Sequence, residues 1–142
     1  MNVIVVEDNQ RLADLYVDVL RHVLRHDARA FADGESFLEA LPALAPDLVV
    51  LDFDLPGRDG LDIARQVRTR YPDLPLLMIS GDPPARNTLV DAILTKPCTI
   101  RQLSEAVTTL LARRGIQNDR FEAERYPSSS FVFNSSQTVT RF

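Results

Sequence analysis

The sequence has one cysteine, no tryptophan, no long apolar run and no excess of basic residues. A single cysteine, Cys98, excludes an internal disulfide framework of the kind that stabilises small secreted domains. The apolar stretch at residues 3–6 is far too short for a signal peptide or a membrane span, so we expect a cytoplasmic protein without a membrane partner. A net charge of −4 with scattered basic residues argues against direct binding to nucleic acid.

What the sequence does contain is an alternation of short apolar segments with amphipathic ones. The apolar segments are residues 3–6, 28–31, 48–51, 76–79 and 92–95. Most of them are rich in aliphatic residues throughout, which is typical of strands buried on both faces. The amphipathic segments between them have the periodicity of helices. Because parallel strands need such crossovers, the pattern predicts an α/β fold with a doubly wound, five-stranded parallel sheet.

Polar and charged residues directly follow the predicted strands. They are Glu7 and Asp8, Asp52 and Asp54, Ser80, and Lys96. Because functional sites in such sheets lie at the carboxyl ends of the strands, we expect these side chains to converge there. Several acids at one place repel each other unless a cation lies between them, and Mg²⁺ is a hard ion that takes oxygen ligands. The lysine and the hydroxyl suit the binding of a phosphoryl group.

These motifs, in this order, resemble the receiver domain of bacterial two-component response regulators. The motifs are Glu7-Asp8, Asp52 followed by Leu55-Pro56 and Asp59-Gly60, Ser80-Gly81, and Lys96-Pro97. The resemblance covers roughly residues 2–114. It implies a flavodoxin-like sheet with the strand order 2-1-3-4-5, in which the first and third strands are neighbours and bring the two acidic motifs together.

The resemblance implies roles for the acidic residues. Asp52 is expected to be the phosphoacceptor, a carboxylate nucleophile that becomes an acyl phosphate. Mg²⁺ is the expected cofactor. Its ligands are expected to be the carboxylates of Asp8 and Asp52, Glu7 directly or through water, and the backbone carbonyl of Asp54. The side chain of Asp54 lies where family members tune the lifetime of the phosphoryl group.

The resemblance also assigns the residues that contact the phosphoryl group, with one departure. Ser80 matches the hydroxyl that hydrogen-bonds the phosphoryl group and moves when it arrives, and Lys96 matches the lysine that pairs with the phosphate. The peptide bond between Lys96 and Pro97 is expected to be cis. The second switch residue, three positions before the lysine, is normally aromatic but here is Ile93, which has no ring to rotate.

A second departure concerns the connection between Ser80 and Lys96, which is shorter than the family norm by more than one helical turn. Pro83 and Pro84 leave room there for about two helical turns at most. We therefore predict that the fourth helix of the family is truncated or absent. Phosphorylation is then expected to rearrange the loop of residues 81–91 instead of shifting a helix.

The end of the chain is expected to lie outside the domain. The last amphipathic helix is predicted to end with Gly115 as its C-cap. We predict a receiver domain over residues 1–115 and a C-terminal tail over residues 116–142. The tail is expected to form a linker or a short hairpin, and it is too short for a separate output domain.

The leading interpretation is a phosphoryl-accepting switch, not an enzyme with multiple turnover. Its expected partners are a sensor histidine kinase or a histidine phosphotransfer protein, together with an effector protein of unknown identity; homodimerisation is left open. One alternative is a receiver-like interaction module that works without phosphorylation. A less favoured one is an aspartyl-phosphate phosphatase, suggested by Asp52-Phe53-Asp54, but that motif normally follows the first strand and not the third.

Overall fold

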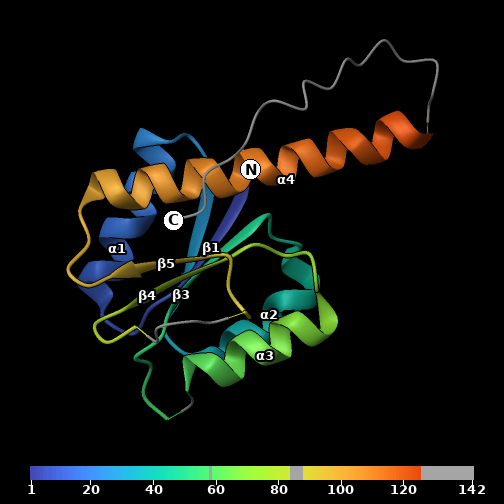
Figure 1. The fold of residues 1–142 in the computed structure, drawn as a ribbon. Helices are drawn as coiled ribbons and strands as arrows, with labels where there is room; N and C mark the ends of the chain where they lie inside the picture. Colours follow the sequence, from blue (N-terminus) through green and yellow to red (C-terminus); the bar gives the residue numbers. More distant parts are fainter. Residues whose placement is uncertain (58, 84–87, 126–142) are drawn as a thin grey trace.

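The computed structural model describes residues 1–57, 59–83 and 88–125, and of residues 116–125 only the backbone. Its centre is a parallel sheet with the strand order β2-β1-β3-β4-β5 (Figure 1). The strands are β1 (Asn2–Val6), β2 (Asp27–Phe31), β3 (Leu48–Asp52), β4 (Leu76–Ser80) and β5 (Ala92–Thr95). The predicted flavodoxin-like doubly wound sheet and its strand order are confirmed.

The register of the strands brings the carboxyl ends of the central strands to one rim. Val6 at the end of β1 pairs with Leu51 of β3, and Asp52 pairs with Ile79 of β4. Every residue of β3 and β4 is buried, as expected for strands covered on both faces. Asp52, the last residue of β3, therefore lies beside the residues that directly follow β1.

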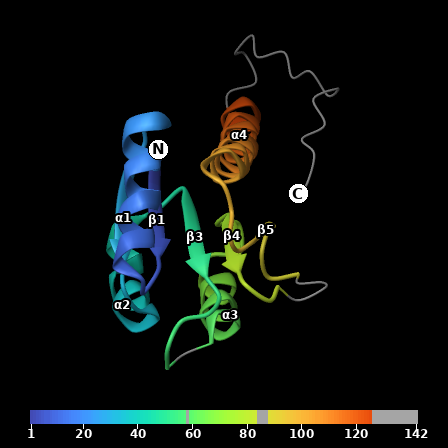
Figure 2. The ribbon, with the colours of Figure 1, turned by 90° about the vertical axis from the view of Figure 1, so that its left-hand side faces the viewer.

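Helices cover both faces of the sheet in two pairs. They are α1 (Gln10–Asp18), its π-helical continuation η1 (Val19–Val23), α2 (Gly34–Leu44), α3 (Gly60–Arg70) and α4 (Ile100–Arg125). Figures 1 and 2 show α1 and α4 on one face, and α2 and α3 on the other. Two separate cores result: Leu20 and Val107 belong to the first, and Phe37 and Ile63 to the second.

Short polar residues fix where three of the helices begin. The side chains of Asn9, Asp33 and Asp59 each accept a hydrogen bond from a backbone amide in the first turn of α1, α2 and α3, respectively. Because Asn9 caps α1 directly after Glu7 and Asp8, these two acids stay in the short loop at the rim of the sheet.

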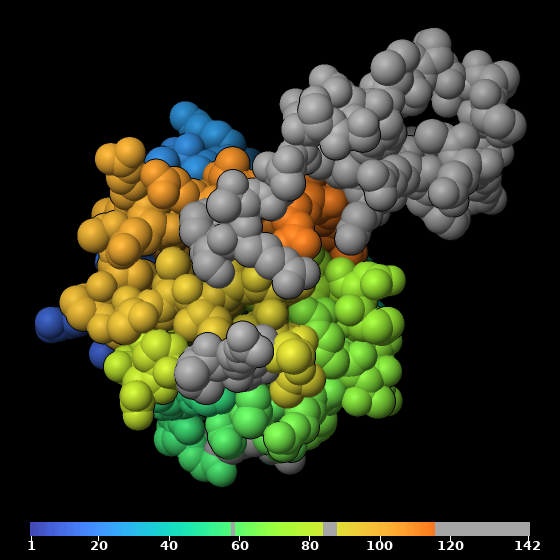
Figure 3. Space-filling model, in the orientation of Figure 1, coloured from blue at the N-terminus to red at the C-terminus, as the bar shows by residue number. Residues whose placement is uncertain are grey.

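The connection from β4 to β5 contains no helix among its described residues, 81–83 and 88–91. This agrees with the prediction of a truncated or missing fourth helix, although residues 84–87 lie outside the described part of the chain. Leu89 and Val90 pack against the core beneath α2 and α3. Figure 3 shows the segment of β5, the edge strand, at the surface between α4 and the region of α3.

The last helix is longer than predicted. Gly115 lies inside α4, which continues to Arg125, so the prediction of a C-cap at Gly115 is wrong. Among the described glycines only Gly57 has a positive φ, whereas a helix-ending glycine usually adopts one. A glycine inside a helix costs only about 1 kcal/mol relative to alanine, and the segment that follows contains good helix formers such as glutamate and arginine.

The far end of the chain can be described only as far as α4. Figure 1 shows the second half of this helix extending past the sheet. The predicted linker or hairpin falls mostly in residues 126–142, which lie outside the described residues. Within the part of the chain that is described, no helix is both long and apolar enough to cross a membrane.

Candidate functional site

The acidic residues of the predicted site meet at the carboxyl rim of β1 and β3. Glu7 and Asp8 directly follow β1, and Asp52 is the last residue of β3. One carboxylate oxygen from each of the three lies within 4.8 Å of the others. Glu7 and Asp52 are almost fully buried, with 2% and 4% of their surface exposed, whereas Asp8 is exposed. The site therefore has a buried floor and one acid at its opening.

Lys96 reaches this cluster from the end of β5. Its backbone amide donates to the carbonyl oxygen of Ser80 at 2.8 Å, and the peptide bond to Pro97 is cis, as predicted. The Lys96 Nζ lies 3.1 Å from Asp52 Oδ1 and 3.8 Å from Glu7 Oε1. One ammonium group thus faces both buried acids.

The pKa values of the two buried acids shift in opposite directions. Burial, with the contribution of Asp52, raises the pKa of Glu7 to about 8. Burial also opposes the ionisation of Asp52, but hydrogen bonds from Glu7, the Asp54 amide and Lys96 outweigh it and lower the pKa of Asp52. Burial lowers the pKa of Lys96, but the attraction of Asp52 and Glu7 reverses this and raises it. At neutral pH and without a cation, these shifts favour a charged Asp52 and a protonated Glu7.

The three acids fit a hard divalent cation. Within the described residues, neither carboxylate oxygen of Glu7 has a hydrogen-bond donor, and a bond to Asp52 forms only while Glu7 is protonated. A buried carboxylate that accepts no hydrogen bond is costly, and a bound cation lowers that cost. Mg²⁺ suits an oxygen-only set that includes one exposed residue, Asp8, because it keeps several of its waters.

Ser80 and Asp54 link the loops that follow β3 and β4. Ser80 is fully buried, and its Oγ accepts a hydrogen bond from the Asp82 amide at 3.2 Å. The Asp54 amide donates to Asp52 Oδ1 at 2.9 Å, and the Asp54 carboxylate accepts from the Gly81 amide at 3.1 Å. Two loops that flank the acidic cluster are therefore joined through the side chain of Asp54.

The structure brings together most of the predicted site residues. Glu7, Asp8, Asp52, Asp54, Ser80 and Lys96 all lie at the same rim. Ile93, the predicted second switch residue, lies within β5, the strand that ends just before Lys96, and is partly buried. Which of these groups hold the cation or contact a phosphoryl group stays a prediction.

Sequence reasoning missed a second polar network around Arg68. Its guanidinium donates to the carbonyl oxygens of Leu89, Pro72 and Leu74, and to Asp91 Oδ2 at 2.6 Å. Asp91 also accepts from the backbone amide that begins β4. The network ties the shortened connection before β5 to α3. Its only sequence signal is an arginine on a helix and a distant aspartate, which is common.

The doubly wound parallel sheet, with a buried aspartate, two further acids and a lysine at its carboxyl rim, has the CheY-like fold. The model of the response regulator receiver domain family matches residues 3–108, and the chain belongs to this family. The predicted resemblance to receiver domains is thus confirmed. Receiver domains as a family are phosphoacceptor signalling domains of two-component systems.

Individual relatives agree with this assignment. The transcriptional regulatory protein BaeR of Escherichia coli is 31% identical over 117 residues, which are 78% of this chain and 48% of that protein. The chain thus spans about half the length of this relative.

Two solved structures share the fold. One is a CheY-like receiver domain from Methanospirillum hungatei, with a TM-score of 0.76 at 19% identity over 82% of this chain and 97% of that one. The other is the response regulator TrrA of Thermotoga maritima in complex with Mg²⁺-BeF, with a TM-score of 0.70 at 24% identity over 77% and 97%.

Proposed function

We propose that the protein is a phosphoryl-accepting switch in which Asp52 takes a phosphoryl group from a histidine kinase or a phosphotransfer protein. The state of Asp52 carries the proposal, since this aspartate is buried and yet has a lowered pKa. Its Oδ1 receives the contacts of Lys96 and of the Asp54 amide, which leaves Oδ2 outside both. A charged oxygen in a fixed orientation is what a carboxylate nucleophile requires.

The transfer conserves the atoms of donor and acceptor. An oxygen of Asp52 forms a bond to phosphorus while the bond from phosphorus to the histidine nitrogen breaks. The imidazole leaves with the bonding electrons and takes up a proton from solvent. The product is an acyl phosphate on Asp52, so the protein is modified once and does not turn over substrate.

The residues around Asp52 have distinct tasks in this proposal. The carboxylates of Glu7, Asp8 and Asp52 would hold Mg²⁺, with the backbone carbonyl of Asp54 as a further ligand. When bound, the ion supplies positive charge to the phosphoryl oxygens. Lys96, which already contacts Asp52, adds a second cation at the same oxygens.

Ser80 would report the arrival of the phosphoryl group. Its hydroxyl accepts from the Asp82 amide and has its own hydrogen left to donate to a phosphoryl oxygen. A movement of Ser80 toward the phosphoryl group would strain or break the bond from the Asp82 amide and thereby disturb the loop after β4. Because Ile93 has no ring to rotate, the loop itself is the element expected to change.

The proposal includes partners that suit such a switch. A cytoplasmic sensor kinase domain or phosphotransfer protein would supply the phosphoryl group, and an effector protein would recognise the changed loop. BaeR is named as a transcriptional regulator, but this chain spans about half of it, so its output does not transfer directly. The Mg²⁺-BeF complex of TrrA supports a site for Mg²⁺ and a phosphoryl mimic.

A phosphorylation-independent interaction module is the second candidate. It is favoured by Ile93 at the switch position and by the absence of a helix among the described residues between β4 and β5. This candidate assigns no function to the buried acidic cluster, and we therefore rank it second.

Intact mass spectrometry after incubation with acetyl phosphate tests the proposal. With Mg²⁺, the wild-type protein should gain one phosphoryl group, and Asp52→Asn should gain none. Chelation of Mg²⁺ should abolish the gain. A wild-type protein that stays unmodified under these conditions would support the interaction module instead.

A further inference from the structure

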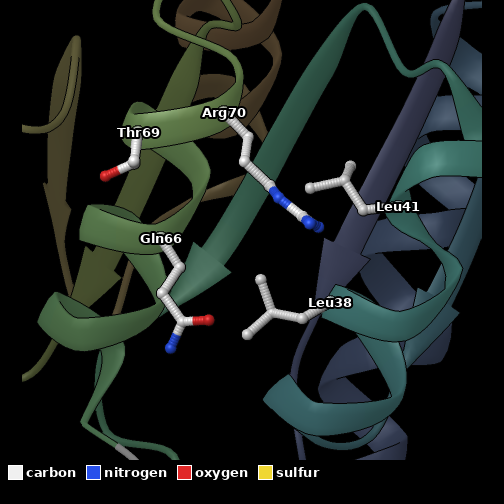
Figure 4. A pocket seen from close by; sticks show the side chains of 5 residues that line it. All are labelled: Leu38, Leu41, Gln66, Thr69 and Arg70. Atoms are coloured by element: carbon white, nitrogen blue, oxygen red, sulfur yellow. The ribbon is translucent and has the colours of Figure 1, made fainter.

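A groove between α2 and α3 lies away from the phosphorylation rim. It encloses about 210 Å³ and is lined by Leu38, Leu41, Gln66, Thr69 and Arg70 (Figure 4). These residues occupy the middle of α2 and the later turns of α3, and both helices run from the carboxyl rim of the sheet back toward its amino ends. A molecule bound in the groove would therefore not cover Asp52.

The groove continues past Arg70 into a second hollow of about 370 Å³. Arg70 lines both, and the second hollow is lined by the loops that lead into β3 and β4. Pro46, Tyr71 and Pro72 give it a largely apolar wall. Two apolar hollows thus lie on either side of one arginine.

Arg70 is the cation in this region that has no partner within the described residues. Arg114, which also lines the second hollow, is already engaged by Asp47 at 3.5 Å and by the carbonyl oxygen of Asp73 at 3.3 Å. No hydrogen bond or ion pair joins Arg70 to the part of the chain that is described, and its side chain is exposed. A guanidinium in this position can bind a carboxylate by two parallel hydrogen bonds.

The same edge of the groove offers an acceptor one helical turn before Arg70, at Gln66 of α3. Gln66 donates from its amide nitrogen to Asp62 at 3.5 Å. Figure 4 shows the amide oxygen of Gln66 and the guanidinium of Arg70 directed toward Leu38 and Leu41. An acceptor, a cation and an apolar floor are the elements that bind a short extended peptide, whose backbone donates and whose side chains fill hollows.

We infer that this groove binds an extended segment of a partner protein in which an acidic side chain is flanked by apolar ones. The acid pairs with Arg70, one apolar side chain contacts Leu38 and Leu41, and the other enters the hollow beside Tyr71. The surface is separate from the phosphoacceptor site, so a partner can dock there whether or not Asp52 is modified.

Other occupants fit less well. Nucleic acid needs several cations along a backbone, whereas among the described residues Arg70 is the one unpaired cation that lines this groove, on a chain with a net charge of −4. A second copy of the chain would have to supply an acid of its own, yet a symmetric contact through the groove brings the two Arg70 groups toward each other instead.

Selection from a display library of random linear peptides on the metal-free, unphosphorylated protein tests the inference. Enriched peptides should share an acidic residue between apolar ones, and the best of them should shift the NMR signals of Leu38, Gln66 and Arg70. Since no Mg²⁺ or phosphodonor is present, the result is independent of the proposed switch.

Variants of the protein and of the selected peptide locate the contact. Arg70→Met should weaken binding at least tenfold, and exchanging the peptide's acid for its amide should have little further effect in this variant. Arg65→Met, an exposed arginine on the same helix that lines neither hollow, should bind as the wild type does. Gln66→Glu should weaken binding by placing a like charge beside the acid.

Several results would overturn the inference. These are no enriched peptide, a consensus without an acid, or binding that Arg70→Met leaves unchanged. Self-association that maps to the groove, or a nucleic acid that shifts the same signals more strongly than the peptide, would assign it to another occupant.

Discussion

At the scale of single residues, the site depends on where one proton resides. Asp52 and Glu7 both lie buried beside one lysine. The lowered pKa of Asp52 favours its charged form, and the raised pKa of Glu7 favours its protonated form. A cation must therefore displace the proton of Glu7 before this carboxylate can bind it. Mg²⁺ affinity should rise with pH up to about 8, the pKa of Glu7, and level off above it.

Calorimetric titration with Mg²⁺ measures this proton directly. In buffers of different ionisation enthalpy at pH 7, binding should release about 0.9 proton per ion, because a group with a pKa of about 8 is mostly protonated there. Glu7→Gln carries no such proton, so its release should fall close to zero. Equal release by both proteins would show that Glu7 is already ionised.

The contribution of Arg68 to stability could not be predicted from the sequence. Its guanidinium satisfies three loop carbonyls and Asp91, and only 17% of its side chain is exposed. Leu89 and Asp91 are more than twenty residues away along the chain, and the nearer partners, Pro72 and Leu74, are backbone carbonyls, so no local pattern of side chains predicts the network. The acidic cluster could be predicted because its members each follow a recognisable apolar strand.

Replacing Arg68 should destabilise the domain. Arg68→Met keeps the aliphatic stem but leaves Asp91 and the loop carbonyls without their donor, which should cost about 2 kcal/mol. Denaturant unfolding measures this. Arg65→Met, on the exposed side of the same helix, should change the free energy of unfolding by less than about 0.5 kcal/mol. Equal effects of the two variants would contradict the importance of the network.

At the scale of elements, the strands could be predicted because their apolar runs leave little choice. The predicted fifth strand, residues 92–95, has the bounds of β5, and the other four differ by one residue at an end. Polar residues caused those differences: Asp52 and Ser80 pair within β3 and β4, although both were expected to follow the strands. Side-chain polarity does not show whether the backbone still pairs.

The end of the last helix could not be predicted in the same way. Glycine is favoured after a helix because it tolerates a positive φ, but the residue type does not show whether that conformation is used. At Gly115 the helix continues instead. The division into a domain of residues 1–115 and a tail of residues 116–142 stays a prediction.

Gly115→Ala separates the two possibilities. A Cβ at this position meets no atom within 4 Å, so alanine inside a continuous helix should stabilise the protein by about 0.5–1 kcal/mol. Thermal and denaturant unfolding measure the change. Destabilisation would mean that Gly115 ends the helix after all.

At the scale of the whole molecule, the two proposed binding regions lie at opposite ends of the sheet. The acidic cluster lies at the carboxyl rim, and the groove beside Arg70 extends toward the amino ends of β3 and β4. Among the described residues of the connection from β4 to β5, Arg68 binds Leu89 and Asp91. The amides of Gly81 and Asp82 instead donate to the side chains of Asp54 and Ser80 at the rim.

Hydrogen exchange should distinguish the early residues of the connection from β4 to β5 from the later ones. Addition of Mg²⁺ and beryllofluoride is expected to alter protection most strongly at residues 81–83, and less at residues 89–91, which Arg68 holds. The variant Asp52→Asn should show neither change. Unaltered exchange throughout residues 81–91 in the wild type would contradict a loop-based switch.

The central claim is that Asp52, among several clustered acids, receives the phosphoryl group. Reduction of the acetyl phosphate-treated protein with borohydride, followed by peptide mass spectrometry, identifies the acid that carried an acyl phosphate. The account predicts modification at Asp52, dependent on Mg²⁺, with Asp8 and Asp54 unchanged. Modification at Asp8 or Asp54, or none at any acid of the rim, would contradict it.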